Sequence, residues 1–205
     1  MDLSTFPTKG NLIKAKANLA LAKMGYELMD KKRTILIAEM LSYISRAERI
    51  QADIDEVFSL AYRWLQNANI TLGINNVELI GNSIPEETKL RVRFRSVMGV
   101  DIPHVSVSPD TGNPYHYAFS NTNYSLDQAY MNFNKVKDLI VEIAEVENTV
   151  YRLAVNVKKT QKRANALESI LIPRLTQLVH DIQNTLDEKE REESSRLHVI
   201  KRLRS

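Results

Sequence analysis

A seven-residue spacing of apolar residues is the feature that most constrains how this chain folds. The first seam position holds Leu12, Leu19, Tyr26, Arg33, Met40, Ala47, Ile54 and Ala61. The companion position holds Ala15, Ala22, Met29, Leu36, Tyr43, Ile50, Val57 and Trp64. Only Arg33 interrupts this apolar seam. A period of 3.5 residues sustained over so many heptads is typical of a long coiled-coil helix and predicts left-handed supercoiling.

A second seam follows later in the chain. Its first position holds Val136, Ile143, Val150, Val157, Ala164 and Leu171. Its companion position holds Leu139, Val146, Leu153, Thr160 and Leu167. Beyond Leu171 the spacing changes to Leu175, Leu178, Ile182 and Leu186, with Pro173 inside the change. We expect a stutter there and a bend near residues 169–173, because an internal proline removes a helical hydrogen bond.

The segment between the seams has a different period. Most of the six glycines and six prolines lie between Gly73 and Pro114. Leu90, Val92 and Phe94 alternate with Arg91, Arg93 and Arg95, and this period of two predicts a half-buried strand. The run 104–108 can pair with it, and the tetrapeptide 109–112, Pro-Asp-Thr-Gly, has the composition of a tight turn.

These patterns predict a mostly α fold: a long antiparallel two-helix left-handed coiled coil with a small β-hairpin-containing insertion in the middle. We divide the chain into an N-terminal coiled-coil helix (1–67), a middle insertion (68–124) and a C-terminal coiled-coil helix (125–205), together one elongated domain. Ser125 and Gln128 have the spacing of a capping box at the start of the last helix.

No pattern in the sequence predicts catalysis, a cofactor or a metal site. The chain has no cysteine, and His104, His116, His180 and His198 lack the spacing of metal ligands. It also lacks the glycine-rich loop that cradles nucleotide phosphates. Asp110-Thr111-Gly112 matches the aspartic protease tripeptide, but Ser108-Pro109 precedes it and favours a turn. With 28 basic and 25 acidic residues, no field for nucleic-acid binding follows, and no apolar run is long enough to span a membrane. We therefore expect a soluble intracellular protein.

Two groups of cations are candidate partner contacts. The first is Lys158, Lys159, Lys162 and Arg163, to which an antiparallel register adds Lys31, Lys32 and Arg33. The second is Arg91, Arg93 and Arg95 on the polar side of the predicted strand. For each group, a solvated face and a contact with an acidic partner are both open. The remaining candidate residues are those of the coiled-coil seam, among them Leu12, Leu19, Met29, Leu36, Met40, Ile50, Ile54, Val57, Ile143, Val150, Val157, Ala164, Leu167 and Leu171.

Several stretches resemble the central-stalk D subunit of V-type and A-type rotary ATPases and ATP synthases. The most specific stretch is residues 156–168, NVKKTQKRANALE, followed by Ile172-Pro173-Arg174-Leu175 and by residues 188–193, EKEREE. Pro7-Thr8-Lys9 with Leu12 fits as well, as does Val97-Met98-Gly99-Val100 ahead of Ile102-Pro103. Met24-Gly25 departs from the family, in which an arginine or another polar residue more often precedes the glycine.

The resemblance implies a non-catalytic rotor shaft that couples ATP hydrolysis or synthesis in the catalytic head to ion translocation through the membrane ring. The implied partners are the catalytic and nucleotide-binding subunits around the shaft, the small F subunit, and a cap subunit that joins the shaft to the membrane ring. The implied location is cytoplasmic and peripheral to the membrane, without cofactor, nucleic acid or membrane insertion. A coiled-coil tether or chaperone-like clamp unrelated to an ATPase is the alternative that the periodicity alone leaves open.

Overall fold

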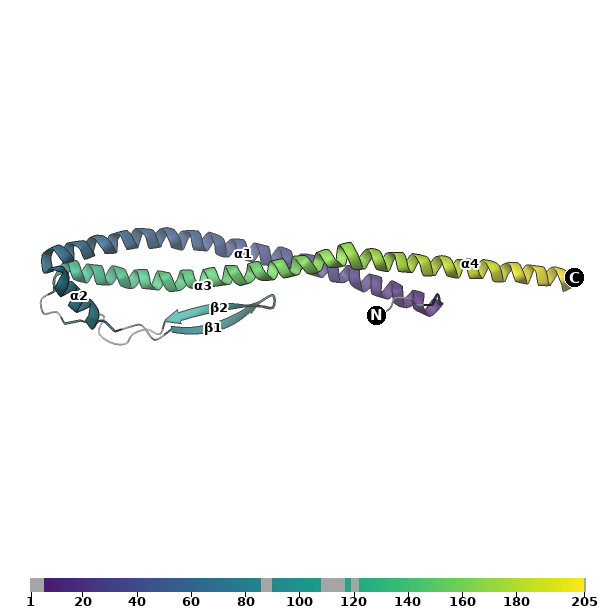
Figure 1. Cartoon of the computed structure of the whole chain (residues 1–205), viewed down its shortest axis with the longest axis horizontal. Coiled ribbons are helices and arrows are strands. Elements are labelled where there is room, and N and C mark those ends of the chain that lie inside the picture. Colours follow the sequence, from purple (N-terminus) through teal and green to yellow (C-terminus); the bar gives the residue numbers. More distant parts are fainter. Residues whose placement is uncertain (1–5, 86–89, 108–116, 119–121, 205) are drawn as a thin grey trace. The chain divides into compact units, whose positions relative to one another are not determined.

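The computed structural model describes residues 6–85, 90–107, 117–118 and 122–204. The elements, in chain order, are α1 (Lys9–Leu72), α2 (Ile74–Ser83), β1 (Leu90–Val97), β2 (Val100–Val107), α3 (Tyr124–Ala166), a π-helical turn η1 (Leu167–Leu171) and α4 (Ile172–Arg204) (Figure 1). The predicted fold class of long helices with a small hairpin between them is confirmed. The chain divides into two compact units, residues 36–156 and residues 1–35 with 157–205.

In the unit formed by residues 36–156, the later part of α1 lies antiparallel beside the earlier part of α3 (Figure 1). Three contacts mark the direction: Arg46 pairs with Glu142, Phe58 lies edge-on to Phe133, and Asn123 donates a hydrogen bond to the Thr71 hydroxyl. The buried side chains along this pair include Leu36, Ile50, Ala61, Val136, Val146 and Leu153. These six residues occupy the two seam positions of the heptad and therefore lie on one stripe of each helix.

The unit of residues 1–35 and 157–205 pairs the start of α1 with the end of α3, η1 and α4. Its buried residues are small or branched: Ala15, Ala22, Thr160, Ala164, Leu175 and Ile182. A Cβ atom added to Gly25 would lie 3.9 Å from Leu167 Cδ1, so these parts of α1 and η1 face each other. At the first residue of α1, Lys9 Nζ lies 2.7 Å from Glu190 Oε1 of α4.

The expected change in seam spacing takes the form of the π-helical turn η1. The backbone N–H of Ile172 donates to the Leu167 carbonyl, a hydrogen bond that spans one residue more than in an α-helix. The seam therefore moves by one residue. Leu171, expected in the seam, is 39% exposed, whereas Ile172 is half-buried and Leu175 and Ile182 are buried.

The ends of the helices depart from the expected caps. Asn123, not Ser125, caps α3: its side-chain oxygen accepts from the Leu126 N–H at 3.0 Å. At the other end, α1 continues to Leu72 and is followed at once by α2, which the sequence pattern did not predict. Gly73 between them has φ of 85°, in the left-handed region that favours glycine.

The strands β1 and β2 form an antiparallel hairpin in which Val97 pairs with Val100. Met98 and Gly99 form its two-residue loop, both with positive φ (51° and 74°), as in a type I′ turn. The expectation of a half-buried first strand was wrong: Leu90, Val92 and Phe94 are 51%, 55% and 61% exposed, and the buried residues Val100, Ile102 and Pro103 belong to β2. The tetrapeptide 109–112 and His116 lie outside the described residues.

Candidate interaction surfaces

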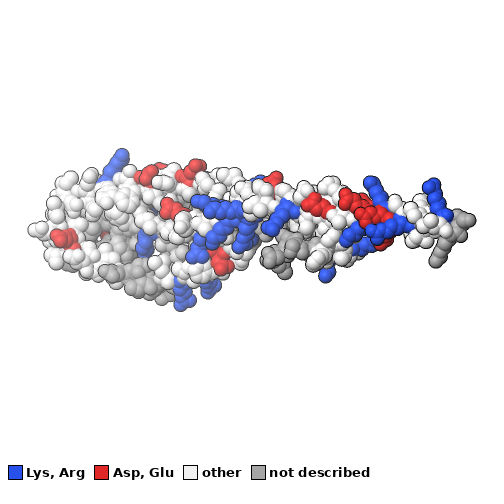
Figure 2. Space-filling model, turned by 45° about the vertical axis from the view of Figure 1, so that its right-hand side comes forward, with Lys and Arg blue, Asp and Glu red and all other residues white. Residues whose placement is uncertain are grey.

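The first group of cations lies on α1 and on the end of α3, within the unit of residues 1–35 and 157–205. Lys31, Lys158, Lys159, Lys162 and Arg163 are exposed, and Lys32 is half-buried. Figure 2 shows lysines and arginines interspersed with acidic side chains on the visible face, so positive charge is partly balanced locally. These exposed cations can meet an acidic partner without disturbing the seam.

Arg33, the charged residue within the α1 seam, forms an ion pair and a hydrogen bond with other residues of the chain. Its Nη2 lies 2.6 Å from Asp30 Oδ1, and its Nη1 donates to Gln161 Oε1 at 2.6 Å. The Gln161 amide in turn donates to Asn165 Oδ1 at 2.6 Å. Arg33 thus ties α1 to α3 through a charge-assisted hydrogen bond, which explains how the seam accommodates a cation.

Beside these cations, the π-helical turn opens an apolar groove of about 340 Å³. The groove is lined by Met29, Arg163, Ala166, Leu167 and Leu171. The Leu171 side chain that the shifted seam leaves exposed is part of this lining. The groove therefore combines apolar surface with positive charge.

The second group of cations lies on β1. Arg91, Arg93 and Arg95 are all exposed. Arg93 and Arg95 also line a cavity of about 480 Å³, to which α1 contributes Tyr43 and Arg46 and α3 contributes Glu145. Arg46 is held by Glu142, whose carboxylate accepts from it and raises the pKa of the Arg46 guanidinium.

Two side chains of α3 that the sequence analysis did not single out hold the hairpin. Glu145 Oε2 accepts from the Val105 N–H at 2.7 Å and lies 3.0 Å from His104 Nδ1. Arg152 Nη1 donates to the Asp101 carbonyl at 3.1 Å, and its guanidinium lies 5.2 Å from the centre of the Phe94 ring. In sequence both occupy heptad positions that are usually solvated, so the seven-residue pattern does not indicate their role.

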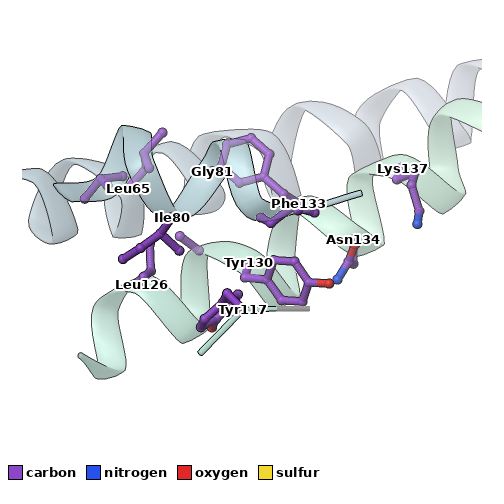
Figure 3. A pocket seen from close by; sticks show the side chains of 12 residues that line it. Leu65, Ile80, Gly81, Tyr117, Leu126, Tyr130, Phe133, Asn134 and Lys137 are labelled. Carbon is purple, nitrogen blue, oxygen red and sulfur yellow. The ribbon is translucent and has the colours of Figure 1, made fainter. Parts of the chain in front are cut away.

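A third surface lies where α2 packs beside α1 and α3. Ala68, Tyr117 and Leu126 form its buried core, with Val77 and Ile80 of α2 packed against it. A pocket of about 340 Å³ opens there, lined mainly by apolar side chains, with Asn134 and Lys137 at one end (Figure 3). Tyr117 Oη donates to Asp127 Oδ1.

A few pKa shifts mark pairs of side chains that join α1 to later helices. The Glu168 carboxylate raises the pKa of Tyr26. The Lys9 ammonium, through its hydrogen bond and its charge, holds the pKa of Glu190 below the ordinary value of 4.5.

Among the described residues, no three His, Cys, Asp or Glu side chains converge as metal ligands. Within the same residues, no helix is long and apolar enough to cross a membrane.

The described geometry is that of an interaction protein: paired long helices, a hairpin held to α3 by two side chains, and charged and apolar surfaces. Comparison with known proteins shows which family of interaction proteins this chain belongs to. The family model for the D subunit of ATP synthase matches residues 11–202, so the chain belongs to the ATP synthase D subunit family. The resemblance noted in the sequence is thereby confirmed.

Several relatives match over nearly their whole length. The chain is 44% identical to the V-type ATP synthase D subunit of Thermotoga neapolitana, covering 97% of this chain and 98% of the relative. It is 38% identical to the A-type ATP synthase D subunit of Methanopyrus kandleri, covering 96% and 85%. It is 35% identical to the A-type ATP synthase D subunit of Thermococcus kodakarensis, covering 98% and 95%.

Proposed function

We propose that this chain is the central rotor shaft of a V-type or A-type rotary ATPase or ATP synthase. It is a non-catalytic subunit, and it couples ATP turnover in the catalytic head to ion translocation through the membrane ring. The observation that carries the proposal is the match to the D subunit family over residues 11–202. The helix pairing in each unit supports it, because two packed helices transmit torque better than one.

The proposed partners follow from the same family membership. The catalytic and nucleotide-binding subunits surround the shaft, the small F subunit binds beside it, and a cap subunit joins it to the membrane ring. The proposed location is the cytoplasmic side, peripheral to the membrane. Lys31, Lys32, Lys158, Lys159, Lys162 and Arg163 form a collar of cations that contacts acidic loops of the surrounding ring. The exposure of Lys158, Lys159, Lys162 and Arg163 supports this role.

The test of the shaft role is co-purification. The full chain carrying an affinity tag is expressed with the remaining subunits of its complex, and the eluted proteins and their ATPase activity are measured. We expect the catalytic subunits to elute with the chain and to hydrolyse ATP. A tether or chaperone-like clamp would elute without them, and that result would refute the proposal.

The collar is tested by charge reversal. Lys162→Glu with Arg163→Glu leaves the buried seam intact, since both side chains are exposed. We expect weaker assembly with the catalytic subunits and a changed dependence of assembly on salt, because exposed charge pairs are screened. Lys14→Glu with Lys16→Glu is the matched control, with the same change in charge on exposed residues of α1. Equal behaviour of the two double variants would leave the collar as a solvated face.

A further inference from the structure

The hairpin of β1 and β2 is attached to the helices mainly by its second strand, with the Phe94 ring of β1 against the Arg152 guanidinium as a further contact. In β2, Val100, Ile102 and Pro103 are buried, whereas every residue of β1 from Leu90 to Ser96 is exposed. A two-stranded hairpin is marginally stable by itself. Its position therefore depends on what joins β2 to α3.

The outward edge of β2 is partly closed by side chains of α3. Alternate residues of a strand direct their backbone groups away from the paired strand. On this edge the Val105 N–H donates to Glu145 and the Asp101 carbonyl accepts from Arg152. Pro103, between them, has no N–H to satisfy. The two side chains of α3 thus satisfy two backbone groups of β2 that a neighbouring strand would otherwise pair.

The two side chains lie on one face of α3, together with the buried Thr149. Glu145, Thr149 and Arg152 follow at intervals of four and three residues, which places them on one face of α3. Thr149 is 0% exposed although it lies outside the predicted seam, and its hydroxyl donates to the Glu145 carbonyl at 2.8 Å. The cavity beside this face shows that apolar packing between hairpin and helices is incomplete.

We propose that Glu145 and Arg152 form a clasp that docks the hairpin on α3, and that the hairpin is a separately releasable arm of this unit. Release exposes the outward edge of β2 and the buried side chains of Val100 and Ile102, while the paired helices stay folded. The inference concerns the free chain and stands apart from its role in an ATPase.

The test is hydrogen exchange of the full chain by NMR, comparing the double variant Glu145→Ala and Arg152→Ala with the unchanged protein. Hydrogen bonds to charged groups are the stronger ones, so we expect hairpin amides to exchange about tenfold to a hundredfold faster. Amides of α1 and α3 should keep their protection. Lys135→Ala with Glu147→Ala is the matched control, since both are exposed residues of α3.

The single variants locate each half of the clasp. Glu145→Ala should act most on the Val105 amide, and Arg152→Ala on the amides nearer the Met98-Gly99 loop. Unchanged hairpin protection in the double variant would show that apolar packing alone holds the arm. Loss of protection throughout α1 and α3 would show that the hairpin is an integral part of the helix pair. Either result overturns the proposal.

Discussion

Leu153 offers the sharpest test of the packed helix pair, because its side chain is fully buried, at 0% exposure. Replacing a buried leucine by alanine removes its burial and leaves a cavity, at a cost of about 2–5 kcal/mol. Two helices can approach each other more easily than the walls of a globular core, so we place Leu153→Ala at about 2–3 kcal/mol, in the lower part of that range. For a chain of this size, that lowers the melting temperature by about 4–12 °C.

The assay is thermal and urea unfolding followed by circular dichroism. Ile140→Ala is the matched control, because it removes as many carbon atoms from the same helix but at a position that is 48% exposed. We expect the control to lose less than about 1 kcal/mol, since exposed positions tolerate truncation. Equal losses for the two variants would refute the assignment of Leu153 to the packed stripe.

Two further predictions concern the unit of residues 1–35 and 157–205. Pro173→Ala restores a backbone donor inside a helix and should raise the melting temperature, because an internal proline costs up to about 3 kcal/mol relative to alanine; a lower melting temperature would contradict this. Lys9→Met should raise the pKa of Glu190 towards its ordinary 4.5, measured by carboxyl NMR. Because the folded pKa of Glu190 is depressed, the stabilisation from this pair is present above pH 4.5 and lost as pH falls through the folded value. An unchanged Glu190 pKa in the variant would exclude the pair.

The helices were predictable because the seam repeats many times. Each heptad adds the same information, so a single departure such as Arg33 does not hide the pattern. The hairpin loop was harder to foresee, because Met98 adopts φ of 51°, a conformation that asparagine or glycine more often marks. The tight turn predicted from composition, residues 109–112, follows the second strand and lies outside the described part of the chain, so that prediction gave no signal for the turn between the two strands.

The contacts of Glu145 and Arg152 could not be predicted from spacing. On a coiled coil both residues occupy positions that face water, and only the return of β2 onto α3 gives them partners. The half-buried strand was misjudged for a related reason. Alternation of apolar and charged residues shows that a strand has two faces, but it does not show whether a neighbour covers the apolar one.

The π-helical turn bears on how this chain compares with its relatives residue by residue. A turn with one extra residue is what a single-residue insertion leaves in an α-helix: the wider turn absorbs the residue, so the seam continues one residue later in the sequence instead of rotating away by about 100°. Deleting one residue between Leu167 and Leu171 would convert the turn to a regular α-helix and leave Leu175 and Ile182 facing the partner helix, now at uninterrupted heptad positions. An alignment of this region that ignores the insertion would assign exposed residues of α4 to the seam, so matched positions should be counted separately before and after η1.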